Sequence, residues 1–153
     1  MKVLIKQDDL SDDCVIGLLR EHLSDMYATS PPESVHALDI PALKAPNITF
    51  FSAWQGHMLA GCVALKKLNS TQAELKSMRT AHGFRNQGVA SRLLSFIVNQ
   101  AKEQGYESLW LETGTQDYFA AARQLYTKFG FELCGPFSDY QPDPNSCFMR
   151  RKV

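Results

Sequence analysis

The segment Arg85-Asn86-Gln87-Gly88-Val89-Ala90 stands between a predicted strand and the most regularly patterned helix of the chain. The first N–H groups of a helix have no backbone partner and carry the positive end of the helix dipole, so they bind anions. Gly88 leaves room for a phosphate near the backbone, Ala90 is small, and Arg85 adds a positive charge. The segment therefore predicts either a phosphate-binding turn or an ordinary strand-to-helix turn with an incidental glycine. It is neither a P-loop nor a dinucleotide-binding fingerprint.

Two carboxylates are candidates for proton transfer. Glu74 lies in a strand that we expect near the centre of the sheet, where strands are usually apolar. Simple alternation places Glu74 and Lys76 on the same face as Met78. Either Glu74 faces a cleft and takes a proton from a substrate amine, or it pairs with Lys76 on a solvated face. Glu112, on the neighbouring strand, is the second candidate.

The spacing of apolar residues indicates the elements that must position these groups. Helical spacing predicts helices at 13–27, at 34–38 after the Pro31-Pro32 break, from Val89 to about Gly105, and at 119–129. Short apolar or β-branched runs predict strands at 2–5, 48–54, 58–68, 73–80, 108–112, from 131, and at 146–151. The unit from 73 to 112 should be a right-handed crossover between parallel strands.

Composition limits the class of protein. The 153 residues, 44% of them hydrophobic, suit one domain over 1–153 whose core needs no disulfide or metal. A formal net charge of zero disfavours nucleic acid and anionic membranes as partners. No apolar run approaches the roughly 20 residues of a membrane span, and the N-terminus has no signal core. Four cysteines and four histidines show no ligand spacing, so we expect buried free thiols, no metal and a cytoplasmic location.

Two motifs resemble a known family. Arg85-x-x-Gly88-x-Ala90 matches the pyrophosphate motif of the GNAT acetyltransferase superfamily, and Leu125-Tyr126-Thr127-Lys128-Phe129-Gly130-Phe131 resembles its Leu-Tyr-x-x-x-Gly-Phe. The element order fits over nearly the whole chain. A closer similarity to the YsnE-like bacterial acetyltransferases runs through 30–34, 74–79, 111–114 and 143–146. The resemblance implies an α/β (α+β) fold with a mixed, mostly antiparallel sheet of six to seven strands, split between strands 4 and 5 and flanked by about four helices.

The resemblance also implies acetyl-CoA as the acetyl donor. Its pantetheine arm would be bound like an added strand by the backbone of Met78, Arg79 and Thr80. Its pyrophosphate would lie on the turn and helix start formed by Arg85, Asn86, Gln87, Gly88, Val89, Ala90 and Ser91. Phe119, preceded by Gln116 and Asp117, stands where the family usually carries an asparagine, which is a departure from the pattern.

Tyr126 occupies the position of the family's general acid. A phenol within hydrogen-bond distance could protonate the CoA sulfur as it leaves. The alternative is a core aromatic on an amphipathic helix, and the Leu-Tyr-x-x-x-Gly-Phe context favours the catalytic role.

The acceptor is expected to be a primary amine of a small molecule or amino acid derivative. Candidate contacts from the first helices and their loop are His22, Tyr27, Glu33 and His36, joined by Glu112 and by Tyr140 in the C-terminal segment. Any of these could instead be a solvated polar residue.

Other functions stay open from the sequence. They are acetylation of a protein N-terminus or lysine, and a non-catalytic acyl-CoA-binding module that regulates a partner. A homodimer is common in the family, and Phe50, Phe51 or Trp54 could either serve it or belong to the core.

Overall fold

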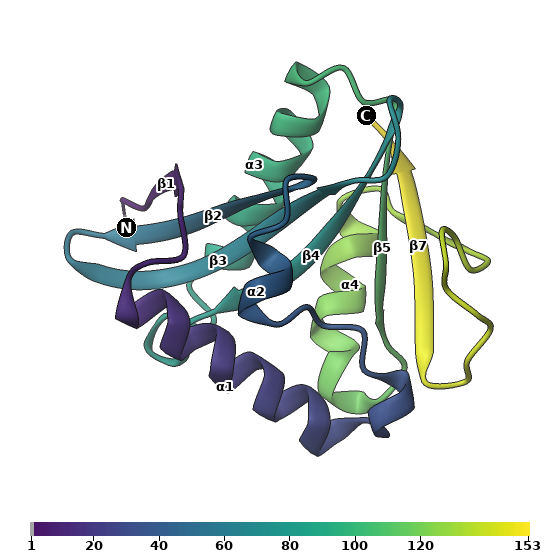
Figure 1. The fold of residues 1–153 in the computed structure, drawn as a ribbon, viewed down its shortest axis with the longest axis horizontal. Coiled ribbons are helices and arrows are strands. Elements are labelled where there is room, and N and C mark those ends of the chain that lie inside the picture. The colour runs from purple at the N-terminus through teal and green to yellow at the C-terminus, as the bar shows by residue number, and fades with distance from the viewer. Residues whose placement is uncertain (1) are drawn as a thin grey trace.

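The computed structural model describes residues 2–153 and contains one seven-stranded mixed sheet in the order β1-β2-β3-β4-β5-β7-β6 (Figure 1). Neighbouring strands run antiparallel except β4 and β5, which run parallel. The strands are β1 (Leu4–Gln7), β2 (Ile48–Gln55), β3 (Met58–Lys67), β4 (Gln72–Thr80), β5 (Ser108–Gly114), β6 (Glu132–Cys134) and β7 (Ser146–Lys152). The α-helices are α1 (Asp13–Thr29), α2 (Ile40–Leu43), α3 (Val89–Glu103) and α4 (Ala120–Lys128). This architecture confirms the predicted fold class.

Helices cover both faces of the sheet (Figure 1). On one face α3 presents Val89, Leu93, Ile97 and Ala101, all fully buried, at the helical spacing that predicted them. The side chains of α4 join this same core. On the other face α1 and α2 pack a second cluster that includes Leu19 and Leu43. No helix in the described part of the chain is long and apolar enough to cross a bilayer.

The sheet splits between β4 and β5. These two strands pair only over Gln72–Glu74 and Ser108–Trp110, and beyond that point they diverge (Figure 1). The remaining backbone groups of β4 on this side, from Ser77 to Thr80, have no β5 partner. The divergence confirms the predicted split and leaves room for a ligand between the strands.

A β-bulge interrupts β4 at Ser77. Lys76 pairs with Ala64 and Arg79 with Cys62, so two residues of β4 stand opposite one residue of β3. Ser77 adopts a positive φ of 53°, which reverses the alternation of side chains. Met78 consequently packs into the α3 core with Leu75, whereas Glu74 and Lys76 face the other way. The expectation that Met78 shares a face with Glu74 is therefore wrong.

Proline and capping chemistry shift the second predicted helix. A 3-10 turn occupies Pro32–Ser34, and α2 starts only at Ile40, where the Asp39 side chain accepts a hydrogen bond from the Ala42 amide. Residues 35–39 between them are not helical, so the prediction of a helix at 34–38 is wrong.

The burial of several side chains differs from what the sequence predicted. Phe50 and Phe51 are buried in the core and cannot form a dimer surface, whereas Trp54 is half-buried. All four cysteines are free, as predicted, but only Cys62 is buried, and Cys14 is exposed.

Candidate active site

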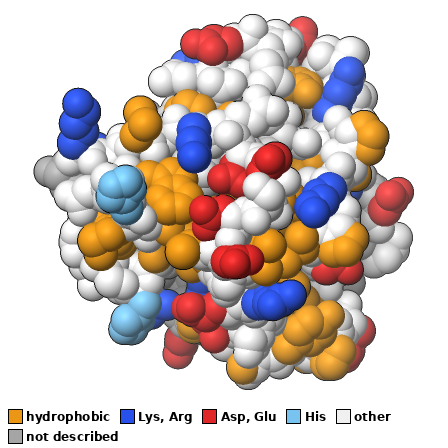
Figure 2. Space-filling view, turned by 60° about the vertical axis from the view of Figure 1, so that its left-hand side comes forward, with side chains coloured by type: hydrophobic (Ala, Val, Ile, Leu, Met, Phe, Trp, Pro, Cys, Tyr) orange, Lys and Arg blue, Asp and Glu red, His pale blue; other side chains and the backbone are white. Residues whose placement is uncertain are grey.

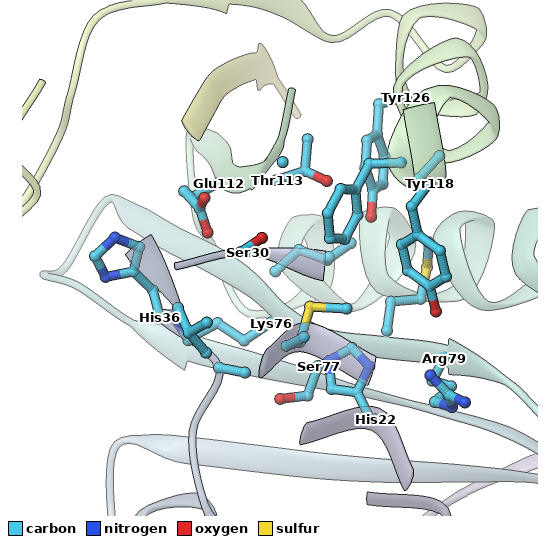
Figure 3. A pocket seen from close by; sticks show the side chains of 18 of the residues that line it. His22, Ser30, His36, Lys76, Ser77, Arg79, Glu112, Thr113, Tyr118 and Tyr126 are labelled. Carbon is cyan, nitrogen blue, oxygen red and sulfur yellow. The ribbon is translucent and has the colours of Figure 1, made fainter. Parts of the chain in front are cut away.

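A cavity of about 460 Å³ lies where β4 and β5 diverge. One wall comes from β4 and α1, and the other from β5 and the start of α4 (Figure 3). The 3-10 turn at Pro32–Ser34 and the residues after it close one end. The cavity therefore lies among the segments that the sequence singled out for chemistry.

The turn before α3 has the geometry of an anion site. Asn86 and Gly88 both have positive φ, 61° and 81°, so the chain curls tightly before the helix. The first helical hydrogen bond runs from the Arg92 amide to the Gly88 carbonyl, and no side chain among residues 2–153 caps this helix end. The preceding amides are left for a ligand, which fits a pyrophosphate.

The structure divides the predicted cofactor residues into two groups. Met78, Arg79, Thr80, Arg85, Asn86 and Phe119 line the cavity. Gln87 to Ser91 lie outside its lining, at the turn and the start of α3. Phe119 lies so close to Gly114 that a Cβ on Gly114 would meet its ring at 2.2 Å. Thus Phe119 shapes the β5 wall sterically and offers no polar contact there.

Glu112 faces the cavity from β5 (Figure 3). Burial raises the pKa of its carboxyl to about 7, although Ser146 and then the charge of Lys76 act in the opposite direction. A carboxyl with a pKa near 7 exists in both protonation states at neutral pH. It is therefore suited to accept and release a proton.

Tyr126 reaches the same cavity from α4 (Figure 3). Its side chain is buried, and its ring packs edge-to-face on Phe131, with centroids 5.8 Å apart. Burial, and secondarily the charge of Glu112, raises the pKa of the phenol, so the hydroxyl stays protonated at neutral pH. The two interpretations of Tyr126 are therefore compatible. Its ring belongs to the core, and its hydroxyl-bearing end meets the cavity.

Glu74 lines the opposite wall, only 1% exposed, and one of its carboxylate oxygens is bound by two neighbours. Lys76 Nζ lies 3.3 Å from Glu74 Oε2, and the Tyr140 hydroxyl donates to that same oxygen at 2.6 Å. The Lys76 ammonium also donates to the Tyr140 oxygen at 2.8 Å. We call these three residues the Glu74 cluster. The Glu74–Lys76 pair predicted by one interpretation is present, but it is buried and not solvated. Glu74 also lines the cavity, as the other interpretation expected, with one oxygen already bound.

The acceptor-side residues are spread over two cavities. His22, His36 and Glu112 line the first cavity. Glu33 and Tyr140 line a second cavity of about 370 Å³, which shares His36, Glu74 and Lys76 with the first. Tyr27 is exposed and lines neither cavity, so the structure does not support it as an acceptor contact.

Sequence reasoning missed a second ion-pair system. The buried Arg79 guanidinium donates to Glu21 and Asp25 of α1, the latter at 2.7 Å, and thereby holds α1 on β4. The Tyr118 hydroxyl donates to the same Asp25 oxygen at 3.3 Å, and both Tyr118 and Arg79 line the cavity. Glu21 and Asp25 recur at one helical turn, a spacing that could have indicated a shared cation.

A polar network also closes the acceptor end. Ser34 donates to Asp143 at 2.6 Å, and the Asn145 amide donates to Ser34 at 3.4 Å, which ties the 3-10 turn to the loop before β7. Both Ser34 and Asn145 line the first cavity. Within residues 2–153, no three His, Cys, Asp or Glu side chains gather as a metal site.

Comparisons with known proteins agree with this architecture. Residues 15–131 match the model of the acetyltransferase (GNAT) family. The chain is 51% identical to the uncharacterized N-acetyltransferase YsnE of Bacillus subtilis (strain 168), over 97% of this chain and 99% of that one. It is 50% identical to the uncharacterized N-acetyltransferase YedL of Escherichia coli (strain K12), over 95% and 91%.

Solved structures show the same fold. A GNAT family acetyltransferase from Elizabethkingia anophelis, solved with acetyl-CoA bound, superposes with a TM-score of 0.69 at 16% identity, covering 99% of this chain and 98% of that one. At this identity the likeness concerns the fold. The match over residues 15–131 and the two relatives at about half identity show that this chain belongs to the acetyltransferase (GNAT) family and is an N-acetyltransferase.

Proposed function

We propose that this enzyme transfers an acetyl group from acetyl-CoA to a primary amine of a small molecule by direct attack. The observation that carries the proposal is the placement of Glu112 and Tyr126 in one cavity, where burial raises the pKa of Glu112 to about 7 and the phenol of Tyr126, its pKa also raised by burial, stays protonated. A cytoplasmic location belongs to the same proposal.

The donor site is assigned to two stretches of backbone. The amides at the start of α3 would hold the pyrophosphate, supported by Arg85. The unpaired edge of β4 from Met78 to Thr80 would bind the pantetheine amides as an added strand would. When bound, acetyl-CoA supplies an activated thioester.

Two side chains would then move protons. Glu112, when ionised, takes a proton from the acceptor amine as its nitrogen forms the new bond to the acyl carbon. Tyr126 donates its proton to the sulfur as the C–S bond breaks, which gives the free thiol. The phenolate would be reprotonated by the proton held on Glu112, since the charge of Glu112 already acts on the Tyr126 hydroxyl. The net products are the amide and CoA.

A small acceptor is favoured by the surface. On the face drawn in Figure 2, basic and acidic side chains are interspersed, and neither sign dominates. Such a face offers no broad charged surface for docking an oppositely charged protein.

The test is thiol release from acetyl-CoA against a panel of amines, amino acids and polyamines, with wild type, Glu112→Gln and Tyr126→Phe. We expect release with one amine class and a loss of about 100-fold or more in each variant. Glu132→Gln, an exposed carboxylate on β6 outside both cavities, is the matched control. Full activity in both cavity variants would refute the assigned roles.

A further inference from the structure

Three polar atoms on the β4 side of the cavity have no assigned role. His22 Nδ1, Ser77 Oγ and Arg79 Nε are each buried and have no hydrogen-bond partner within residues 2–153. All three residues line the first cavity. Figure 3 shows His22 beside Ser77 on the wall opposite Glu112 and Tyr126. Buried polar groups are usually paired, so three orphans together indicate a missing partner.

Two features of the fold bring these residues to one cavity. The bulge at Ser77 places Arg79 on the α1 side of the sheet, where Glu21 and Asp25 hold its Nη2. The Nε–H group of the same guanidinium is left over. His22 lies on α1 one residue after Glu21, so the ion pair that anchors α1 also fixes the imidazole.

The charges around these atoms select the kind of partner. Arg79 already faces two carboxylates, so its positive charge is not available to an anion. A second positive charge is disfavoured at the same place, since burial and then the charge of Arg79 lower the pKa of His22 to about 4. A neutral imidazole and a hydroxyl each offer a donor and an acceptor, and Arg79 Nε adds a donor.

We propose that His22, Ser77 and Arg79 form an acceptor subsite for an uncharged hydrogen-bonding group, a hydroxyl or a carboxamide, carried by the amine that is acetylated. This deepens the proposed function and rests on it. The reacting amine lies toward Glu112, and the uncharged group lies against α1 on the opposite wall. The acceptors are then amino alcohols or amino amides in preference to diamines, amino acids or alkylamines.

The experiment compares acceptors that differ only in the group at the far end. Linear primary amines of two to six carbons ending in methyl, hydroxyl, carboxamide, ammonium or carboxylate are assayed by thiol release. At the best chain length we expect kcat/KM for hydroxyl or carboxamide to exceed that for methyl, ammonium and carboxylate by about 10-fold or more. Equal values, or a preference for a charged end group, would overturn the subsite.

Variants of His22 test whether this residue causes the preference for an uncharged polar end group. His22→Leu removes the ring nitrogen. The ratio of kcat/KM for the hydroxyl-ended amine to that for the methyl-ended amine should then fall toward one. His22→Asn returns a polar atom near the Nδ1 position and should restore much of it. His57→Leu, at the exposed β2–β3 turn, is the matched control and should keep the wild-type ratio. A ratio unchanged in His22→Leu, or a change confined to the KM for acetyl-CoA, would show that the atoms bind only water or the donor.

A binding measurement separates this inference from the proposed function. Titration calorimetry of the same amines into CoA-loaded protein requires no turnover. Tighter binding of the hydroxyl or carboxamide amines, lost in His22→Leu, would support the subsite even if no thiol were released. Equal binding of all end groups would overturn the subsite, while thiol release would still decide the proposed function.

Discussion

Glu74 and Glu112 stand on adjacent strands and on the same face of the sheet, yet their carboxylates meet opposite environments. Glu74 has a cation and a phenol on a single oxygen, Lys76 at 3.3 Å and Tyr140 at 2.6 Å. Burial dominates at Glu112, whose pKa rises to about 7. The β4 wall therefore holds a charge that is already neutralised, and the β5 wall holds a carboxyl that can gain or lose a proton.

The comparison shows that burial alone does not identify a catalytic carboxylate. A buried carboxylate with a hydrogen-bonded cation is stabilised as an anion, and it serves to fix its neighbours. Here the Glu74 cluster joins β4 to the loop before β7 through Tyr140. Glu112 is therefore the candidate base, because it lines the cavity and burial raises its pKa to about 7.

The largest expected effect contrasts the two carboxylates directly. Glu112→Gln should lower kcat/KM by about 100- to 1000-fold, because the amine loses its proton acceptor. Glu74→Gln should lower it by less than about 10-fold, since the amide can still accept from Lys76 and Tyr140. Thiol-release kinetics on both variants give the comparison, and melting temperatures check that both fold. If the order of the two losses were reversed, Glu74 would be the base.

Removal of the cation should mainly affect stability. Lys76→Met leaves the Glu74 carboxylate buried without its charge partner, so the free energy of unfolding should fall by about 3–5 kcal/mol. The double variant Lys76→Met/Glu74→Leu, which removes both charges, should recover most of that loss. Urea unfolding measures all three proteins. An unchanged Lys76→Met variant would mean that water replaces the cation and that the pair is weakly coupled.

The pH dependence should follow Glu112. Its pKa is raised by burial and the base must be ionised, so activity rises with pH up to about 7. Below that value, log kcat/KM for wild type should gain about one unit per pH unit more than for Glu112→Gln with the same acceptor. Comparison with the variant removes the titration of the amine itself. Parallel profiles would exclude Glu112 as the titrating base.

The smallest effect concerns the third member of the Glu74 cluster. Tyr140→Phe removes the hydroxyl that donates to Glu74 and accepts from Lys76, so stability should fall by about 1–3 kcal/mol. Activity should fall by less than about 10-fold, because Glu112 and Tyr126 stay in place. Tyr118→Phe, which loses only a hydrogen bond of 3.3 Å to Asp25, is a matched control for stability. A loss of activity as large as that of Glu112→Gln would give Tyr140 a role in proton transfer.

Much of the fold could be predicted from local pattern. The apolar spacing from Val89 to Ala101 predicts α3, whereas the split after β4 is implied by the family resemblance and not by any local pattern. The bulge at Ser77 could not be predicted, because serine gives no signal for its positive φ. That one residue decides which way Met78 and Arg79 point.

The site was predictable in residue identity and less so in environment. Tyr126, Glu112 and Glu74 were identified from motif and strand position. The engagement of Glu74 depends on Tyr140, 66 residues away, and the pKa of Glu112 depends on burial that only the assembled fold creates. Local spacing carries no information on such contacts.

The short pairing between β4 and β5 has a consequence for how the chain folds. Strands β2, β3 and β4 meet through consecutive hairpins, whereas β5 joins β4 through three residue pairs after the whole of α3 has been crossed. Non-local pairing of this kind loses chain entropy on loop closure before the stabilising contacts form, so we expect it to form late. We expect the seam that holds the cavity to close last and open first, with amides of Ser108–Trp110 exchanging with solvent faster than those of β3.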